Sequence, residues 1–391
     1  MNPFPILNAA ESDAGLQVDG PAPQIASLLI KPASALCNLD CTYCFYLDRE
    51  ADPYEASRSR IMSRETLQQL VRGYLEYSHP KSAFAFQGGE PTLAGLDFFR
   101  SLVEFQQEFG GRGQAISNSI QTNGTLLNAE WCRLFREYEF LVGLSLDGPQ
   151  DIHDAYRVNK GGQGTFEQVM AAVKRLKRER VEFNVLTVVS QANVRRAAEV
   201  YRYFRDLGLE FMQFIPLVEY RADGRLEPFS ITGEEYGDFL SELFEAWWPE
   251  RRTVRVRHFD NIAEALAGQL PGTCTMHGSC HSYAVVEHNG DVYPCDFFVE
   301  RTWKLGNIHA DSWPDIAGRV RRHNFAAKKA TPHATCAVCE YQSLCHGGCP
   351  SNRHAVRHQF EDLDPMCAGY KKIYAKSIEP LRADLRELGV L

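Results

Sequence analysis

The chain has 391 residues, 44% of them hydrophobic and 24% charged, which is the composition of an ordinary folded protein and excludes a disordered or fibrous one. This length allows one large domain with a smaller one beside it. A formal net charge of -8 argues against a general nucleic-acid binder, which would carry a basic face, although it leaves room for a local basic pocket.

The start of the chain, residues 1–23, holds four prolines and no sustained hydrophobic period, so we expect a surface extension there. It lacks the charged start and apolar core of a secretory signal. No stretch of the chain reaches the roughly 18 apolar residues of a membrane span. We therefore expect a cytoplasmic protein with no membrane partner. Twelve cysteines in a cytoplasmic protein indicate metal or redox chemistry, because the reducing thiol pools of the cytoplasm keep cysteine pairs reduced.

From residue 25 onward, β-rich runs alternate with longer runs at helical spacing. The expected strands are 25–32, 83–86, 115–121, 140–146, 183–189 and 210–218. The expected helices begin at Ser63 and continue at 96–110, 128–139, 165–180, 195–208 and 233–248. Six βα units in series predict a parallel sheet wrapped by helices, either open and doubly wound or a partial barrel. Six strands are too few for the closed eight-stranded barrel.

The alternation ends near residue 250, where short elements and eight cysteines follow. Residues 283–296 predict a hairpin, in which Asn289 and Gly290 suit a two-residue type I′ turn. We therefore divide the chain into an extension (1–23), a barrel domain (24–250) and a cysteine-rich domain (251–391).

Three cysteines, Cys37, Cys41 and Cys44, lie in the loop after the first strand. Their spacing is not the usual zinc arrangement, although a zinc knot that borrows a distant fourth ligand is an alternative. A [4Fe–4S] cluster normally takes four thiolates. Three thiolates would leave one iron open for a substrate or cofactor.

This Cys-x3-Cys-x2-Cys stretch resembles the signature of the radical S-adenosylmethionine (radical SAM) superfamily, in which an aromatic residue, here Tyr43, precedes the last cysteine. The resemblance implies a partial (β/α)6 barrel, in agreement with the six units counted above. It also implies that the amino and carboxylate groups of S-adenosylmethionine chelate the open iron. One electron then splits the sulfonium to give a 5′-deoxyadenosyl radical.

A second motif, FQGGEPTL, follows the second strand and is similar to the superfamily's methionine-ammonium site. Paired glycines let backbone approach a ligand closely, and a glutamate can accept from an ammonium. Taken alone, Gly-Gly-Glu-Pro is a turn before a helix. The residues implied to contact the cofactor are Gln87, Gly88, Gly89 and Glu90.

Two later segments match further cofactor positions. Ser145, at the end of the fourth strand, and Arg157 match residues that contact the ribose and carboxylate of the cofactor, and a guanidinium suits a carboxylate. Taken alone, Arg157 would be interpreted as part of a surface salt bridge. Leu217 and Val218 end the sixth strand, where the resemblance implies contact with the adenine; as apolar strand residues they equally suit the core.

Eight cysteines downstream are enough for two complete four-thiolate clusters, with a zinc ribbon as the alternative. The segment resembles the SPASM extension of radical SAM enzymes, which carries two auxiliary [4Fe–4S] clusters. The resemblance implies one cluster on Cys274, Cys280, Cys295 and Cys349, and another on Cys336, Cys339, Cys345 and Cys367. Spacing alone could not reveal that Cys349 belongs to the first set. Cys132, on the apolar face of a helix, is expected to be a buried hydrophobe.

Within this superfamily, residues 26–370 resemble the anaerobic sulfatase-maturating enzymes, above all in GDVYPCDFFV and KLGNI. These enzymes oxidise one Cys or Ser of a nascent sulfatase to Cα-formylglycine. The resemblance implies an unfolded or nascent sulfatase and a flavodoxin- or ferredoxin-like electron donor as partners. The alternative is a SPASM maturase that crosslinks or epimerises a ribosomally made peptide. A zinc-bearing adaptor without catalysis is a third interpretation.

The oxidation requires a general base near the radical. Asp296, directly after Cys295, matches the family's proposed base; taken alone it would be a surface carboxylate of a hairpin. Tyr46 matches a residue near the substrate peptide, although it could merely pack the cysteine loop.

Overall fold

The computed structural model describes residues 25–46, 53–54, 57, 59–280, 283–322 and 325–391, so the extension expected at 1–23 lies outside the described part. The described residues form one sheet of ten strands. Eight strands are parallel, and seven of them follow one another in chain order: β1 (Ser27–Lys31), β2 (Lys81–Phe86), β3 (Ala115–Thr122), β4 (Leu141–Ser145), β5 (Phe183–Val189), β6 (Phe211–Pro216) and β7 (Arg255–Val256). Three more extend the sheet beyond β1: β8 (Tyr283–Glu287), β9 (Asp291–Tyr293) and β10 (Gly306–Asn307).

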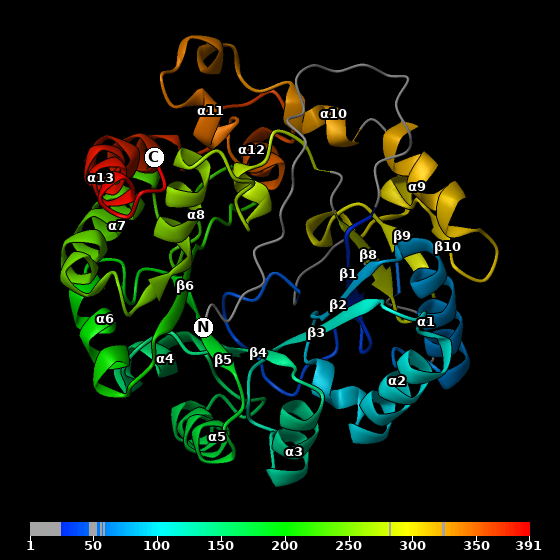
Figure 1. Cartoon of the computed structure of the whole chain (residues 1–391). Helices are drawn as coiled ribbons and strands as arrows, with labels where there is room; N and C mark the ends of the chain where they lie inside the picture. Colours follow the sequence, from blue (N-terminus) through cyan, green and yellow to red (C-terminus); the bar gives the residue numbers. More distant parts are fainter. Residues whose placement is uncertain (1–24, 47–52, 55–56, 58, 281–282, 323–324) are drawn as a thin grey trace.

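Helices follow the first six strands, which confirms the predicted partial (β/α)6 barrel. They are α1 (Arg64–Ser78), α2 (Leu96–Phe109), α3 (Ala129–Glu137), α4 (Gln150–Tyr156), α5 (Phe166–Glu179), α6 (Ala197–Asp206) and α7 (Gly233–Trp247). Figure 1 shows strands β1 to β6 curved around a common interior, with these helices on the outer side. The carboxyl ends of parallel strands share one edge, so the loops after β1, β2, β4 and β6 meet there.

Local sequence explains where these helices begin. Ser63 caps α1 by accepting the backbone N–H of Thr66 at 3.1 Å. Thr232 and Glu235 form a capping box at the start of α7. The apolar stripe of α1, at helical spacing, is buried: Leu67, Leu70, Val71, Tyr74 and Leu75.

The cysteine-rich segment continues the barrel sheet. β8 pairs in parallel with β1, from Ser27 opposite Tyr283 to Lys31 opposite Glu287. β7, which lies beyond residue 250, pairs with β6, so the sheet has no break at the predicted domain boundary. The position of that boundary stays a prediction. The strand that leads into the loop of the first three cysteines therefore pairs directly with a strand of the segment that carries eight further cysteines.

The predicted hairpin is formed by β8 and β9, but its turn differs from the prediction. Val286 lies opposite Val292, which leaves a three-residue loop, 288–290, between Glu287 and Asp291. The N–H of Gly290 donates to the carbonyl of Glu287 at 2.8 Å, and Gly290 has a φ of 84°. This is a type I turn closed by a left-handed glycine, and the predicted two-residue type I′ turn is wrong. Asn-Gly suits both turns, so the dipeptide could not distinguish them.

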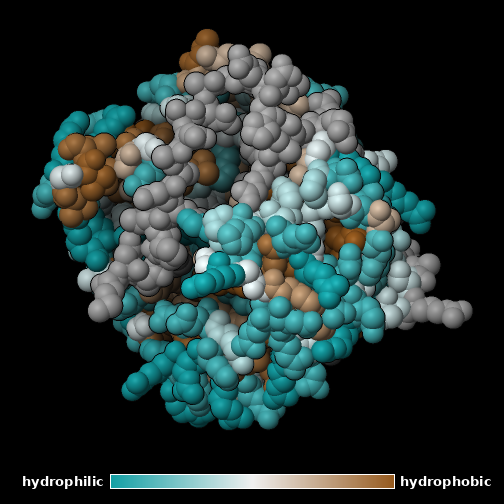
Figure 2. Space-filling model, turned by 45° about the vertical axis from the view of Figure 1, so that its right-hand side comes forward, coloured by the Kyte–Doolittle hydropathy of each residue, from teal (hydrophilic) through white to brown (hydrophobic). Residues whose placement is uncertain are grey.

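The remaining helices are α8 (Arg257–Leu266), α9 (Trp313–Arg322), α10 (Phe325–Ala330), α11 (Gln342–Cys345), α12 (Pro350–Arg357) and α13 (Cys367–Glu387). α13 packs against α7, where Gly233 and Gly237 face Gly369 with almost no space between the backbones. The face in Figure 2 is mostly hydrophilic, with hydrophobic residues in small separate patches. Among the described residues, no helix combines the length and the apolar content needed to cross a bilayer.

The contact between α7 and α13 is testable. A Cβ at position 369 would lie 2.4 Å from the carbonyl oxygen of Gly233, a backbone atom that cannot move aside without separating the helices. We expect Gly369→Val to lower the free energy of unfolding by about 3 kcal/mol or more. Ala375→Val, at an exposed position of the same helix, should change it by less than about 1 kcal/mol. Thermal unfolding of both variants measures this, and equal melting temperatures would contradict the close packing.

Candidate functional site

The loop after β1 holds Cys37, Cys41 and Cys44 as half-buried thiols. The loop is tied to the segment after β4, since the backbone N–H of Asp40 donates to Val158 at 2.8 Å and that of Thr42 donates to Tyr156 at 2.9 Å. Burial raises the pKa of the Cys37 and Cys41 thiols. A catalytic thiol nucleophile needs a lowered pKa, so these thiols suit metal coordination instead, where the ion itself removes the proton.

The glycines of the second motif make room for the cysteine loop. A Cβ at Gly89, whose φ is 49°, would lie 2.0 Å from the carbonyl oxygen of Leu36. A Cβ at Gly88, whose φ is 101°, would lie 2.6 Å from Cε of Lys31. The predicted close approach at these glycines is therefore made by the chain itself. Beside them, Gln87 donates its backbone N–H to Ile30 at 3.0 Å.

Glu90 is fully buried at the same edge and links three loops. Its carboxylate accepts from the Thr92 hydroxyl at 2.6 Å, the Thr122 hydroxyl at 2.8 Å and the backbone N–H of Asn123 at 2.8 Å. Burial raises the pKa of Glu90, while these hydrogen bonds lower it. Asn123 also donates to Cys37 Sγ at 3.7 Å. A contact between Glu90 and an ammonium stays a prediction, and would add to these hydrogen bonds.

Arg157 forms a buried ion pair rather than the surface salt bridge considered above. Its Nε donates to Asp147 Oδ2 at 2.8 Å and its Nη2 to Oδ1 at 3.1 Å, and Arg157 is 7% exposed. The Tyr43 hydroxyl donates to the same carboxylate at 2.5 Å. Burial opposes ionisation of Asp147, but Arg157 outweighs it and lowers the pKa of that carboxyl. The predicted contact of Arg157 with a cofactor carboxylate would use the guanidinium N–H groups that do not bind Asp147.

Sequence reasoning missed Asp147. It follows β4 directly, in SLDGP, and an acidic residue at the carboxyl end of a barrel strand is the signal that could have identified it. Nearby, Ser145 accepts from Gln121 Nε2 at 3.1 Å, which fixes its hydroxyl at the end of β4. Leu217 is buried after β6, and Val218 packs against the main hydrophobic core. Their contact with an adenine stays a prediction.

Asp296 is not a surface carboxylate, since only 4% of it is exposed. The Tyr46 hydroxyl donates to its Oδ2, and Lys31 Nζ lies 3.2 Å from its Oδ1. The ring of Phe45 packs at a tilt against the rings of Tyr46 and Phe297, with centroid distances of 4.1 Å and 4.9 Å. The two residues predicted separately as base and substrate contact are thus brought together, in hydrogen-bonding contact.

The structure gathers the first predicted auxiliary set, including the distant Cys349. Burial is the main cause that raises the pKa of each thiol, and neighbouring thiols raise three of them further: Cys349 and Cys274 act on Cys280 and Cys295, and Cys274 acts on Cys349. The values reach about 12 for Cys280 and about 11 for Cys349. These mutual effects show that the thiols lie near one another across 75 residues of chain, and their holding one cluster stays a prediction.

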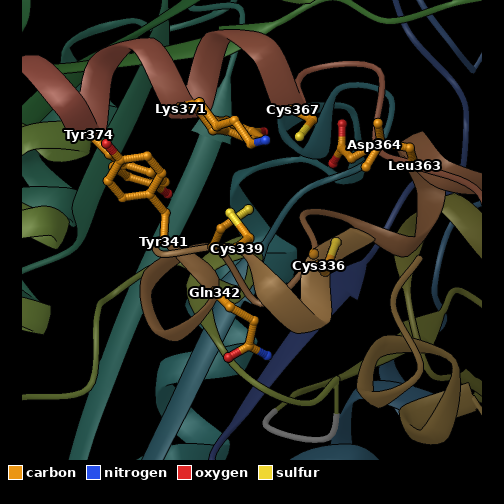
Figure 3. A pocket seen from close by; sticks show the side chains of 12 residues that line it. Cys336, Cys339, Tyr341, Gln342, Leu363, Asp364, Cys367, Lys371 and Tyr374 are labelled. Carbon is orange, nitrogen blue, oxygen red and sulfur yellow. The ribbon is translucent and has the colours of Figure 1, made fainter. Parts of the chain in front are cut away.

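The second set lines a cavity between α11, α13 and the segment before α11. Its sulfur-bearing residues are Cys336, Cys339, Cys345 and Cys367. In Figure 3, Cys336, Cys339 and Cys367 point into this cavity, and Asp364 and Lys371 lie beside them. Asp364 also links the two sets, because its Oδ2 accepts the backbone N–H of Cys349 at 2.8 Å. Both sets offer the four thiolates of a [4Fe–4S] cluster. Cys132, on α3, is instead buried in the hydrophobic core.

Comparisons with known proteins agree with this geometry. Residues 32–204 match the family model of the radical SAM superfamily, and residues 274–340 match that of an iron-sulfur cluster-binding domain. A cysteine-type anaerobic sulfatase-maturating enzyme of Clostridium novyi is 36% identical, over 91% of this chain and 96% of its own length. A serine-type enzyme of Bacteroides thetaiotaomicron is 37% identical, over 89% and 88%.

Solved structures give the same result. Native anSMEcpe with bound AdoMet and Cp18Cys peptide is 37% identical, with a TM-score of 0.85 over 93% of this chain and 99% of its own. SuiB of Streptococcus suis bound to S-adenosylmethionine has a TM-score of 0.60 at 15% identity, over 88% of this chain and 77% of its own, and is similar in fold alone.

The division of the eight thiols can be tested with pairs of substitutions. If Cys274 and Cys349 hold the same cluster, Cys274→Ala/Cys349→Ala loses about four of about twelve irons per chain, whereas Cys336→Ala/Cys349→Ala loses about eight. Iron and sulfide analysis of anaerobically purified protein measures both. Cys132→Ala, which removes a core thiol, should keep all the iron. Equal losses from the two double variants would contradict the division.

Proposed function

This chain belongs to the anaerobic sulfatase-maturating enzymes, and from that premise we propose that Asp296 is the general base with which it oxidises its substrate. The enzyme converts a Cys or Ser side chain of a sulfatase polypeptide to Cα-formylglycine. Its cofactors are three [4Fe–4S] clusters and S-adenosylmethionine. When bound, they supply the radical that takes a hydrogen from the substrate Cβ and the acceptor for the electron that remains.

The observation that carries the role of Asp296 is its placement. The carboxylate is buried directly after Cys295, and it accepts from Tyr46, which lies in the cysteine loop two residues after Cys44. A base must reach the thiol or hydroxyl of the target residue. From this position, Asp296 Oδ2 can take that proton while Tyr46 keeps the carboxylate oriented. A buried base also excludes water, which would otherwise compete for the proton.

We assign the other roles to the residues predicted from the sequence. Cys37, Cys41 and Cys44 hold the cluster that binds S-adenosylmethionine. The remaining eight thiols hold the auxiliary clusters in the sets given above. The cofactor contacts are Tyr43, Gln87, Gly88, Gly89, Glu90, Ser145, Arg157, Leu217 and Val218. Of these, Glu90 and Arg157 act partly by holding the loops of the binding edge together, as their hydrogen bonds to the chain support.

Two further proposals concern the electron donor and the location of the enzyme. An external one-electron donor of the flavodoxin or ferredoxin type would reduce the first cluster, because cofactor cleavage consumes an electron. The enzyme would work in the cytoplasm, a location that its twelve cysteines suit, since a reducing compartment keeps thiols from forming disulfides.

The substrate is tested with two sulfatase peptides that differ only in having Cys or Ser at the target position. Incubated with S-adenosylmethionine and a reductant, the Ser peptide should lose the mass of two hydrogens. The Cys peptide should lose two hydrogens and exchange sulfur for oxygen. Mass spectrometry measures both, and a peptide with Ala at that position is the control. Unchanged masses, with crosslinking or epimerisation of another peptide, would favour the peptide-maturase alternative.

The base is tested with Asp296→Asn, which keeps the size of the side chain and a hydrogen-bond acceptor. We expect wild-type iron content and cleavage of S-adenosylmethionine, but at least about a hundredfold less formylglycine, because general-base catalysis contributes that much or more. The ratio of formylglycine to 5′-deoxyadenosine separates the two steps. A wild-type ratio would remove Asp296 from the mechanism.

A further inference from the structure

Lys31 is a buried cation at the edge of the sheet where the loops meet. It ends β1, six residues before Cys37, and only 1% of it is exposed. Its Nζ lies 2.9 Å from Glu287 Oε1 and 3.2 Å from Asp296 Oδ1, and 4.7 Å from the centroid of the Tyr46 ring. A lysine is almost never buried in this way unless it is paired, and here two carboxylates pair with it.

The fold makes specific room for this side chain. Lys31 passes over Gly88, where a Cβ would lie within 3.1 Å of three carbons of the lysine stem. The first glycine of the second motif is thus required by Lys31. Space next to a strand end is normally filled by an apolar side chain, so an ammonium kept there at the cost of desolvation indicates a role beyond packing.

Glu287 is placed to anchor Lys31. The parallel register of β1 and β8 sets the two residues opposite each other. Burial opposes ionisation of Glu287, but Lys31 and a hydrogen bond from His288 outweigh it and lower the pKa of Glu287 to about 2. Glu287 is therefore a carboxylate throughout the working pH range. Because strand pairing fixes both backbones, the ammonium has a defined position, from which it can orient a third group.

That third group is Asp296. Its two oxygens are held from different sides: Lys31 lies at Oδ1, and Tyr46 donates to Oδ2. An aspartate carboxylate held at one oxygen could rotate about its Cβ–Cγ bond, whereas one held at both has a single orientation. A base that is displaced by about 1 Å can lose on the order of a hundredfold in rate, so orientation is worth as much as the base itself.

We propose that Lys31, anchored on Glu287, is the positioning residue that orients Asp296 toward the hydrogen of the substrate thiol or hydroxyl. This inference rests on the proposed role of Asp296. Lys31 takes no proton and touches no substrate. It couples the first strand of the barrel to the hairpin that carries Asp296, so that the base lies at a fixed place relative to the cysteine loop.

The test replaces the charged pair together, because Lys31→Met alone would leave two buried carboxylates side by side. The double variant Lys31→Met/Glu287→Gln keeps the size of both side chains and removes the charge of each. We expect wild-type iron content and cleavage of S-adenosylmethionine, with the ratio of formylglycine to 5′-deoxyadenosine reduced about tenfold or more. Lys81→Met, an exposed lysine at the start of β2, is the matched control and should keep the wild-type ratio.

A second measurement follows the charges without catalysis. Lys31→Met should melt at a lower temperature than Lys31→Met/Glu287→Gln, because the double variant removes the repulsion between Glu287 and Asp296. A single variant that is as stable as the double would overturn the ion-paired arrangement.

Three results of the ratio measurement decide the proposal. A wild-type ratio in the double variant overturns it. Iron content and cofactor cleavage that fall together with formylglycine assign Lys31 a purely structural role, which overturns it as well. Asp296→Asn, measured alongside, separates the two hypotheses: if it also keeps the wild-type ratio, the proposed base itself has failed, and if it alone lowers the ratio, only the role of Lys31 has failed.

Discussion

The parallel pairing of β8 with β1 is the interaction on which the arrangement of this enzyme depends. β1 leads into the loop with Cys37, Cys41 and Cys44, and β8 begins the hairpin that leads to Cys295 and Asp296. Backbone hydrogen bonds along five residue pairs fix these two strands in register. The loop of Cys37, Cys41 and Cys44 and the proposed base therefore have a constant separation, although more than 240 residues of chain lie between them.

Buried charges then organise the edge of the sheet where the loops meet. Arg157 pairs with Asp147, and Lys31 pairs with Glu287 and Asp296. Such pairs add little net stability over apolar packing, but removal of one partner leaves an uncompensated buried charge at a cost of about 3–5 kcal/mol. They act as constraints on position. An enzyme that handles a radical needs this, because a loosely held group near the reacting carbon would itself be a target.

Several features were predictable because their signals are local. The amphipathic stripe of α1 and the β-rich runs each repeat within one element, so they predicted six βα units that the structure contains. The spacing of Cys37, Cys41 and Cys44 falls within one loop. Asp296 and Tyr46 could be proposed from motif position, but nothing in the sequence indicated that they are hydrogen-bonded. Asn289 and Gly290 predicted a hairpin correctly and its turn wrongly, because that dipeptide suits two loop lengths.

By itself, the sequence determined the fold class and the family and predicted the cluster ligands, since periodicity and cysteine spacing are properties of short segments. Only the tertiary structure decided which distant residues share an environment. It brought Cys349 to the set with Cys274, turned Arg157 onto Asp147, and buried Lys31 between Glu287 and Asp296. The physical reason is that strand register and helix packing bring together residues from ten to more than 250 positions apart, and no local pattern in the chain records which ones will meet.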